Sequence, residues 1–373
     1  MATAYHAEHV GSLLRTPDLL AAREAHQRGE IGTDRLREQE DRAALAAIEV
    51  QRQAGIKIFT DGEVRRATWM AGLLESLGGV VEQPPAPRVK WHGNGADPPD
   101  EETAFVLVTA SEKLYQKANH TSLEAAFLAR HAPGQYKITM MSCAQGTILW
   151  QPGISADVYP TPQDMMADLV ALQIKEIEGL IDQGVTWIQL DSLTYNSVID
   201  PEFRRQAGVP AELTPEIILA EAIAVDTQLV RAAKAKNPDV TIGMHFCRGN
   251  NRSAWMAEGG YDMVAERLFG EVGVDRFLLE YDTERAGGFE PLRFMRDGTT
   301  VVLGLVSSKR PELESPDDLR RRIDEAAKYV PLDNLALGPQ CGFASTALGN
   351  LLTVDDERRK LELVVNTAGQ VWG

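Results

Sequence analysis

Cysteines and long apolar runs are scarce in this 373-residue sequence. Its three cysteines lie far apart, so a secreted disulfide framework is not expected, and free thiols are typical of the cytoplasm. No apolar run reaches the roughly 18 residues that span a bilayer. The N-terminus also lacks a charged-then-apolar secretion signal. We therefore expect a cytoplasmic protein without a membrane partner.

Basic residues are also few, because 38 Lys and Arg stand against 54 Asp and Glu, which gives a formal net charge of −16. This excess of acid opposes binding of nucleic acid by bulk electrostatics. Two nucleotide-binding motifs are missing as well. No G-x-G-x-x-G follows the first expected strand, and G-x-x-x-x-G-K-[ST] occurs nowhere. Dinucleotide-binding and P-loop proteins are therefore disfavoured.

What the sequence does contain is an ordinary globular composition, with 44% hydrophobic and 25% charged residues. Short apolar runs alternate with long helical patterns. Strands are expected at residues 4–12, 56–60, 137–142, 186–191, 240–245, 276–281, 300–306 and 335–339. Helices are expected at residues 16–53 with a break at Gly29, and at 162–183, 215–235, 261–269, 290–296, 315–329 and 354–371.

This alternation of strands and helices predicts an α/β fold with a parallel sheet. Eight such units favour one (β/α)₈ TIM barrel over residues 1–373, with a doubly wound open sheet as the alternative. The regularity fails at about residues 78–133. Gly and Pro cluster early in this region, a strand-like run covers 104–110, and helical sequence covers 122–130. We interpret the region as an insertion between strands two and three, formed by a hairpin and a helix.

The run T-I-G-M-H-F-C at residues 241–247 carries the first chemical signal. His245 and Cys247 stand two positions apart at a strand end, so both side chains point to the same side. An imidazole and a thiol together suit a borderline metal such as zinc. The alternative is a buried cysteine beside a hydrogen-bonded histidine, both serving packing alone.

Further polar residues gather at the expected strand ends, which form the active site of a TIM barrel. Zinc takes four ligands, and the predicted set is His245, Cys247, Glu280 and Cys341. Glu280 lies one strand–helix unit after Cys247, and Cys341 lies two units after Glu280. Neighbouring strand ends would thus share one Zn²⁺. Cys143, in contrast, is expected to be a small core residue.

The motifs H-x-C, L-L-E-Y-D and G-P-Q-C-G together resemble the zinc-binding set of the cobalamin-independent methionine synthase family. The motifs H-V-G-S-L-L-R, T-D-G-E-V-R-R and W-I-Q-L-D fall at strand ends where that family contacts its thiol substrate. The resemblance covers nearly the whole chain and only the catalytic half of the long members. The chain is most similar to short stand-alone members, a group that includes the epoxyalkane–coenzyme M transferases.

This resemblance implies a Zn²⁺ cofactor and transfer of an alkyl group, specifically methyl, to a small thiol such as homocysteine. The metal-bound thiolate would attack the alkyl carbon of methylfolate, a methylated corrinoid or another donor, because a metal lowers the pKa of a bound thiol. No catalytic residue beyond the metal site is implied. The substrate-binding residues implied by the resemblance or suggested by position are His9, Gly11, Ser12, Glu63, Asp191 and Lys309.

Two departures from the family pattern leave alternatives open. The family's Q-V/I-D-E-P reads Q-L-D-S-L at residues 189–193, and its D-I-H-S-P, which holds a proton-donating His, reads S-S-K-R-P at 307–311. Lys309 would suit an anionic substrate group, which motivates zinc-dependent thiol addition to an epoxide, or the reverse C–S lyase reaction. A binding protein on a retired enzyme scaffold is a third hypothesis, and the zinc-free uroporphyrinogen decarboxylases share the architecture. A homo-oligomer is left open.

Overall fold

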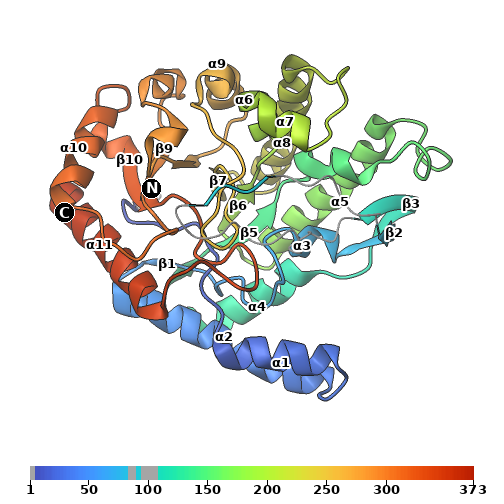
Figure 1. Cartoon of the computed structure of the whole chain (residues 1–373), viewed down its shortest axis with the longest axis horizontal. Helices are drawn as coiled ribbons and strands as arrows, with labels where there is room; N and C mark the ends of the chain where they lie inside the picture. The colour runs from blue at the N-terminus through green and yellow to red at the C-terminus, as the bar shows by residue number, and fades with distance from the viewer. Residues whose placement is uncertain (1–4, 83–89, 94–107) are drawn as a thin grey trace.

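The computed structural model describes residues 5–82, 90–93 and 108–373 (Figure 1). Six parallel strands form the central sheet in the order β10-β9-β8-β7-β6-β5. They are β5 (Ile138–Met141), β6 (Trp187–Asp191), β7 (Thr241–Phe246), β8 (Arg276–Glu280), β9 (Thr300–Val306) and β10 (Leu335–Pro339). Nearly every residue in them is buried, as expected for parallel strands covered on both faces. The α/β fold and these six strands confirm the prediction, with strand bounds shifted by one or two residues.

The two edges of this sheet are extended by short segments. At the β5 edge, β1 (Ile58–Phe59) pairs in parallel with β4 (Gln135–Tyr136), which directly precedes β5. At the β10 edge, Ala7 makes a single parallel bridge with Leu337. The strands follow one another in sequence order, without the reversal that marks a doubly wound sheet.

These two extensions approach each other through individual hydrogen bonds. The Leu13 amide donates to the Gly62 carbonyl at 3.0 Å, and the Thr60 hydroxyl donates to the Gly11 carbonyl at 2.7 Å. In the described part of the chain, no strand ladder joins the two edges. The closed barrel therefore stays a prediction.

The first expected strand, residues 4–12, is wrong as a strand over the residues described. Only Ala7 is bridged, because beyond Glu8 the backbone leaves the sheet edge. Gly11 takes a φ of 153°, which only glycine adopts readily, and Leu13 then bonds to the loop after β1. Residue 4 lies outside the described residues.

Long helices surround the strands (Figure 1). They are α1 (Pro17–Gln27), α2 (Thr33–Ala54), α5 (Pro162–Asp182), α8 (Pro215–Lys236), α9 (Asp262–Glu271), α10 (Pro316–Ala326) and α11 (Val354–Trp372). Helices α1, α5, α8 and α10 begin with a Ser or Thr N-cap followed by Pro, which explains why their starts were predicted to within a residue or two. In the described residues, no helix is both long and apolar enough to cross a membrane.

Shorter elements were missed or differ in type. The elements not predicted are α3 (Ala71–Leu74), α6 (Asn196–Ile199), α7 (Pro201–Gln206) and the 3₁₀ turns η1 (Cys143–Leu149), η2 (Glu284–Ala286) and η4 (Leu332–Asn334). The helical piece expected at 290–296 is a 3₁₀ turn, η3 (Glu290–Phe294). Elements of one or two turns contain too few residues to show a helical period.

A hairpin and a helix are found where the irregular region was expected. Strand β2 (Leu77–Glu82) pairs antiparallel with β3 (Val108–Gln116), and α4 (His120–His131) follows. The expected strand at 104–110 lies partly outside the described residues, and from Val108 onward it continues as β3. Whether residues 78–133 form an insertion into a barrel stays a prediction. Residue His92, in the same region, makes an antiparallel bridge with Trp255.

Candidate metal and substrate site

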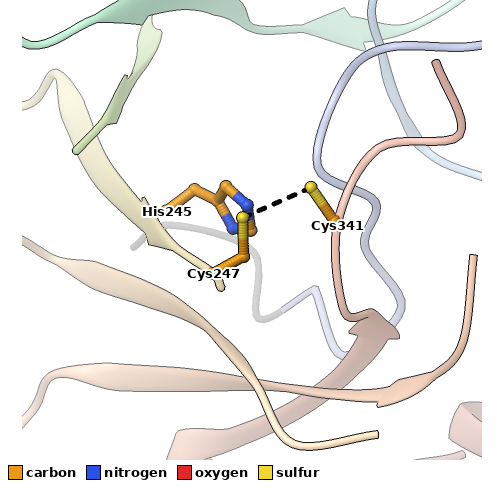
Figure 2. Close-up of side chains that lie close together, drawn as sticks. All are labelled: His245, Cys247 and Cys341. Carbon is orange, nitrogen blue, oxygen red and sulfur yellow. Dashed lines mark hydrogen bonds between the residues drawn. The ribbon is translucent and has the colours of Figure 1, made fainter. Parts of the chain in front are cut away.

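Three predicted metal ligands meet at the carboxyl ends of the strands. His245 and Cys247 point to one side of the end of β7, and Cys341 faces them from the loop after β10 (Figure 2). Their ligand atoms all lie within 4.8 Å of one another, and the two sulfurs are 3.4 Å apart. All three residues are buried. Strands β8 and β9 separate β7 from β10 in the sheet, so this meeting requires a strongly curved sheet.

The three side chains fit a zinc ion chemically. His245 Nδ1 bonds to the Leu278 carbonyl at 3.1 Å, which leaves Nε2 as the free ring nitrogen. Nε2 is buried and has no hydrogen-bond partner among the described residues. The hydrogen bond between the two thiols holds the pKa of Cys341 well below its ordinary value and raises that of Cys247, so it favours one of the two thiolates that zinc would bind. Two sulfurs and one imidazole nitrogen form a common zinc donor set.

Glu280, the fourth predicted ligand, lies at the end of β8 outside this three-residue group. Its Oε1 accepts hydrogen bonds from Arg285 at 2.6 and 3.1 Å, and its Oε2 accepts one from the Arg248 amide at 2.9 Å. Burial raises the pKa of Glu280, but the charges of Arg285, Lys309 and Arg248 together outweigh that effect, and the net pKa falls below its ordinary value. Glu280 is thus an ionised, buried carboxylate, and its role as a ligand stays a prediction.

A pocket beside the three-residue group brings several predicted substrate residues together. Ser12, Glu63 and Asp191 line it together with His245, Cys247 and Cys341. The remaining lining residues were not predicted as site residues; they are Val10, Trp69, Leu193, Asn250, Gly342 and Ser345. Two of them carried a weak signal: Trp69 as an aromatic ring that could wall a pocket or belong to the core, and Asn250 as part of the R-G-N-N-R run at residues 248–252.

Glu63 is held in an unusual conformation at this pocket. Its φ of 55° is left-handed, a region that costs a residue with a side chain about 1–3 kcal/mol and is typical of functional positions. Its Oε1 accepts from the Thr139 hydroxyl at 2.7 Å. Its Oε2 is buried without a hydrogen-bond partner among the described residues, 3.9 Å from Arg66 Nη1. One carboxylate oxygen is therefore available to a ligand.

Asp191 is the second acid of the pocket. Its Oδ1 accepts a hydrogen bond from the side-chain amide of Gln189 at 2.8 Å, and the side-chain oxygen of Gln189 accepts one from Lys137 at 2.7 Å. Burial raises the pKa of Asp191 to about 7. A cation bound against this carboxyl group would favour the ionised form and would be attracted by its negative charge. Gln189 lies in the W-I-Q-L-D motif, but its bond to Lys137 joins separate strands and leaves no signal in the sequence.

The other three predicted substrate residues lie beside the pocket and not in its lining. His9 is buried, its Nε2 lies 3.1 Å from the Ile58 carbonyl, and burial lowers its pKa to about 3. The ammonium group of Lys309 donates to the Gly249 carbonyl at 2.8 Å and to Asn250 Oδ1 at 3.1 Å. A Cβ atom on Gly11 would lie 2.8 Å from Glu63 Oε1, so a glycine here makes room for the acid. Cys143 is fully buried in the core, as expected.

The fold and the site together define a class: an α/β protein with a buried His-Cys-Cys group and two acids at the carboxyl ends of its parallel strands. The family model described as "Cobalamin-independent synthase, Catalytic domain" matches residues 109–369. The chain belongs to the cobalamin-independent methionine synthase family, as its motifs predicted.

Relatives of similar length support this assignment. YxjH, an uncharacterized protein of Bacillus subtilis (strain 168), is 35% identical over 99% of this chain and 95% of its own length. A methionine synthase of Pyrococcus abyssi is 22% identical over 90% of this chain and 85% of its own. The crystal structure of a protein from Listeria monocytogenes, provisionally described as a vitamin-B12 independent methionine synthase, has 30% identity and a TM-score of 0.74, and the match covers 100% of this chain and 99% of that one.

Proposed function

We propose that this protein transfers a methyl group to a small thiol, with homocysteine as the specific acceptor, and that the reaction depends on zinc. The observation that carries the proposal is the meeting of His245, Cys247 and Cys341 beside Glu63 and Asp191 in one pocket. Family membership supports methionine synthase-like chemistry. The sulfur of the thiol loses its proton and forms a bond to the methyl carbon, while the bond between that carbon and the donor breaks.

His245 Nε2, Cys247 Sγ and Cys341 Sγ would hold the Zn²⁺, with Glu280 as the fourth ligand. When bound, zinc would lower the pKa of the substrate thiol and hold its sulfur in place. The hydrogen bond from His245 Nδ1 to the Leu278 carbonyl keeps Nε2 aimed at the cysteines. Burial of all three side chains excludes water that would compete for the metal.

The acids of the pocket would recognise the amino group of homocysteine. Glu63 offers its Oε2, which accepts no hydrogen bond among the described residues and lies 3.9 Å from Arg66 Nη1, and Asp191 becomes fully ionised when an ammonium group binds next to it. Ser12 would donate to the substrate carboxylate. We assign supporting roles to the residues beside the pocket: Gly11 leaves space for Glu63, His9 braces the strand carrying Ile58, and Lys309 fixes Asn250.

We propose further that residues 1–373 form one closed (β/α)₈ barrel with the insertion at about 78–133. The close approach of Cys247 and Cys341, which follow strands separated by two others, supports closure. A cytoplasmic location fits this function. Epoxide opening and the reverse lyase reaction are not proposed, because Lys309, which motivated them, is already hydrogen-bonded to Gly249 and Asn250.

The proposal is tested first by zinc content. The wild type is expected to hold about one zinc per chain. Cys247→Ser is expected to lose it, and Cys143→Ser, which alters another buried cysteine outside the site, is expected to keep it. Absence of zinc from the wild type after loading under reducing conditions would overturn the proposal.

The acceptor and donor are tested next with zinc-loaded protein. Homocysteine is offered with methylfolate, with a methylated corrinoid and with a small activated methyl compound, and methionine is measured. Formation of methionine from one donor identifies that donor. Failure with all three, while zinc is bound, would exclude methyl transfer to homocysteine and leave only the metal site.

A further inference from the structure

Arg285, a residue of η2, stands between Glu280 and an aromatic ring. Its guanidinium donates twice to Glu280 Oε1 and lies 3.3 Å from Asp282 Oδ1. The guanidinium carbon is 4.7 Å from the ring centre of Trp255, a cation–π distance. Only 7% of the Arg285 side chain is exposed, so these contacts fix its position.

The contacts of Glu280 restrict how this carboxylate can bind a metal. An ionised carboxylate has about four lone-pair positions. Arg285 occupies both positions on Oε1, and the Arg248 amide occupies one on Oε2. Arg248 directly follows Cys247, a proposed zinc ligand. Counting partners in the described part of the chain, one lone pair is therefore left free, and it is on Oε2, the oxygen that is hydrogen-bonded next to this cysteine.

Trp255 is held in turn by His92. The backbone amide of His92 donates to the Trp255 carbonyl at 2.7 Å, and the Trp255 amide donates to the His92 carbonyl at 2.9 Å. The two rings stack with their centres 5.9 Å apart. The Lys90 amide also donates to Gln206 Oε1 at 2.8 Å. Residues 90–93 are thus attached to the loop that follows the zinc-binding pair.

We infer that Arg285 is a positioning residue for Glu280, and that Trp255, braced by residues 90–93, holds Arg285 in the orientation that presents Glu280 to the metal. The inference rests on the proposed zinc site. Arginine suits this role because its planar, permanently charged fork fixes the plane of a carboxylate. Partners that orient metal ligands in this way contribute about 10–100-fold to metal affinity.

The test is metal affinity of the whole protein, measured by competition with a chelator, together with the absorption spectrum of the cobalt-substituted form. Arg285→Met should weaken Zn²⁺ binding by about 10–100-fold and change the cobalt ligand-field bands. Arg285→Lys, which keeps the charge and loses the fork, should fall between Met and wild type. Trp255→Leu should shift affinity in the same direction by a smaller factor.

Arg322→Met is the matched control. Arg322 also stacks on an aromatic ring, that of Phe289, and donates to the carbonyl of Tyr281, the residue after Glu280. Among the described residues it makes no hydrogen bond or ion pair with Glu280, so its removal should leave affinity and spectrum unchanged. Wild-type affinity and spectrum in Arg285→Met, or tighter binding there, would overturn the inference.

A double-substitution cycle separates positioning from general destabilisation. If Arg285 acts through Glu280, the Glu280→Gln and Arg285→Met losses of affinity should not add, and the double variant should resemble Glu280→Gln alone. Additive losses would overturn the inference. A wild type that binds zinc and makes methionine while Arg285→Met binds zinc normally refutes this inference alone. A wild type that binds no zinc refutes the proposed function as well.

Discussion

Replacement of Gly11 by alanine should disturb both stability and substrate binding. The φ of Gly11 is 153°, and a Cβ atom would lie 2.7 Å from Thr139 Cγ2 and 2.8 Å from Glu63 Oε1. Thr139 and Glu63 are hydrogen-bonded to each other and buried, so neither can yield without breaking that bond. Backbone strain of about 1–2 kcal/mol and overpacking of about 1–3 kcal/mol give an expected loss of about 2–5 kcal/mol.

The assay is urea unfolding of Gly11→Ala beside Gly29→Ala. Gly29 also has a positive φ, 73°, but a Cβ atom there would meet nothing within 4 Å, so it isolates the backbone cost. The KM for homocysteine should rise in Gly11→Ala, because the displaced carboxylate is Glu63, and should stay unchanged in Gly29→Ala. Equal unfolding free energies for the two variants, with an unchanged KM, would refute the reasoning.

Three further predictions follow from buried groups. Glu63→Gln should raise the KM for homocysteine far more than it lowers kcat, since the amide cannot balance an ammonium charge, and an unchanged KM would show that Glu63 does not meet the substrate. Zinc should raise the melting temperature of the wild type and of Cys143→Ser but not of Cys341→Ser, as calorimetry with and without chelator can check. Burial raises the pKa of Glu357 to about 8 from 4.5, so the folded state keeps this proton up to a higher pH than the unfolded state does. The free energy of unfolding therefore falls as the pH rises from about 4.5 to about 8. Glu357→Gln should flatten that decline in melts at several pH values, and a decline as steep as in the wild type would contradict the assignment.

The sequence predicted well those elements that depend on neighbouring residues. Buried strands such as β6 are short apolar runs, and helices such as α5 and α10 carry Thr or Ser caps followed by Pro, so local pattern was enough. The strand expected at residues 4–12 was predicted wrongly because its pairing depends on residues about 330 positions away, around Leu337. The candidate metal ligands were found because they lie at or just after strand ends and stand in motifs that resemble those of the family.

The surroundings of the site could not be predicted from the sequence. Nothing near Glu280 in the sequence shows that Arg285 would cover one of its oxygens, or that Trp255 would cover Arg285. The placement of Lys309 beside Asn250, and not in the pocket, depends on loops from two different strands. Such contacts arise from tertiary packing, which leaves no periodic signal.

The buried charges at the start of the chain bear on how it is made. Glu8 is fully buried between Lys137 and Arg276, with oxygen–nitrogen distances of 3.0 and 2.9 Å. Arg276 is synthesised 268 residues after Glu8. An unpaired buried carboxylate is costly, so the segment around Glu8 has no stable place in the fold until Arg276, 268 residues further along, has also been synthesised. The β10 edge of the sheet is therefore extended by Ala7, which is synthesised long before its bridging partner Leu337.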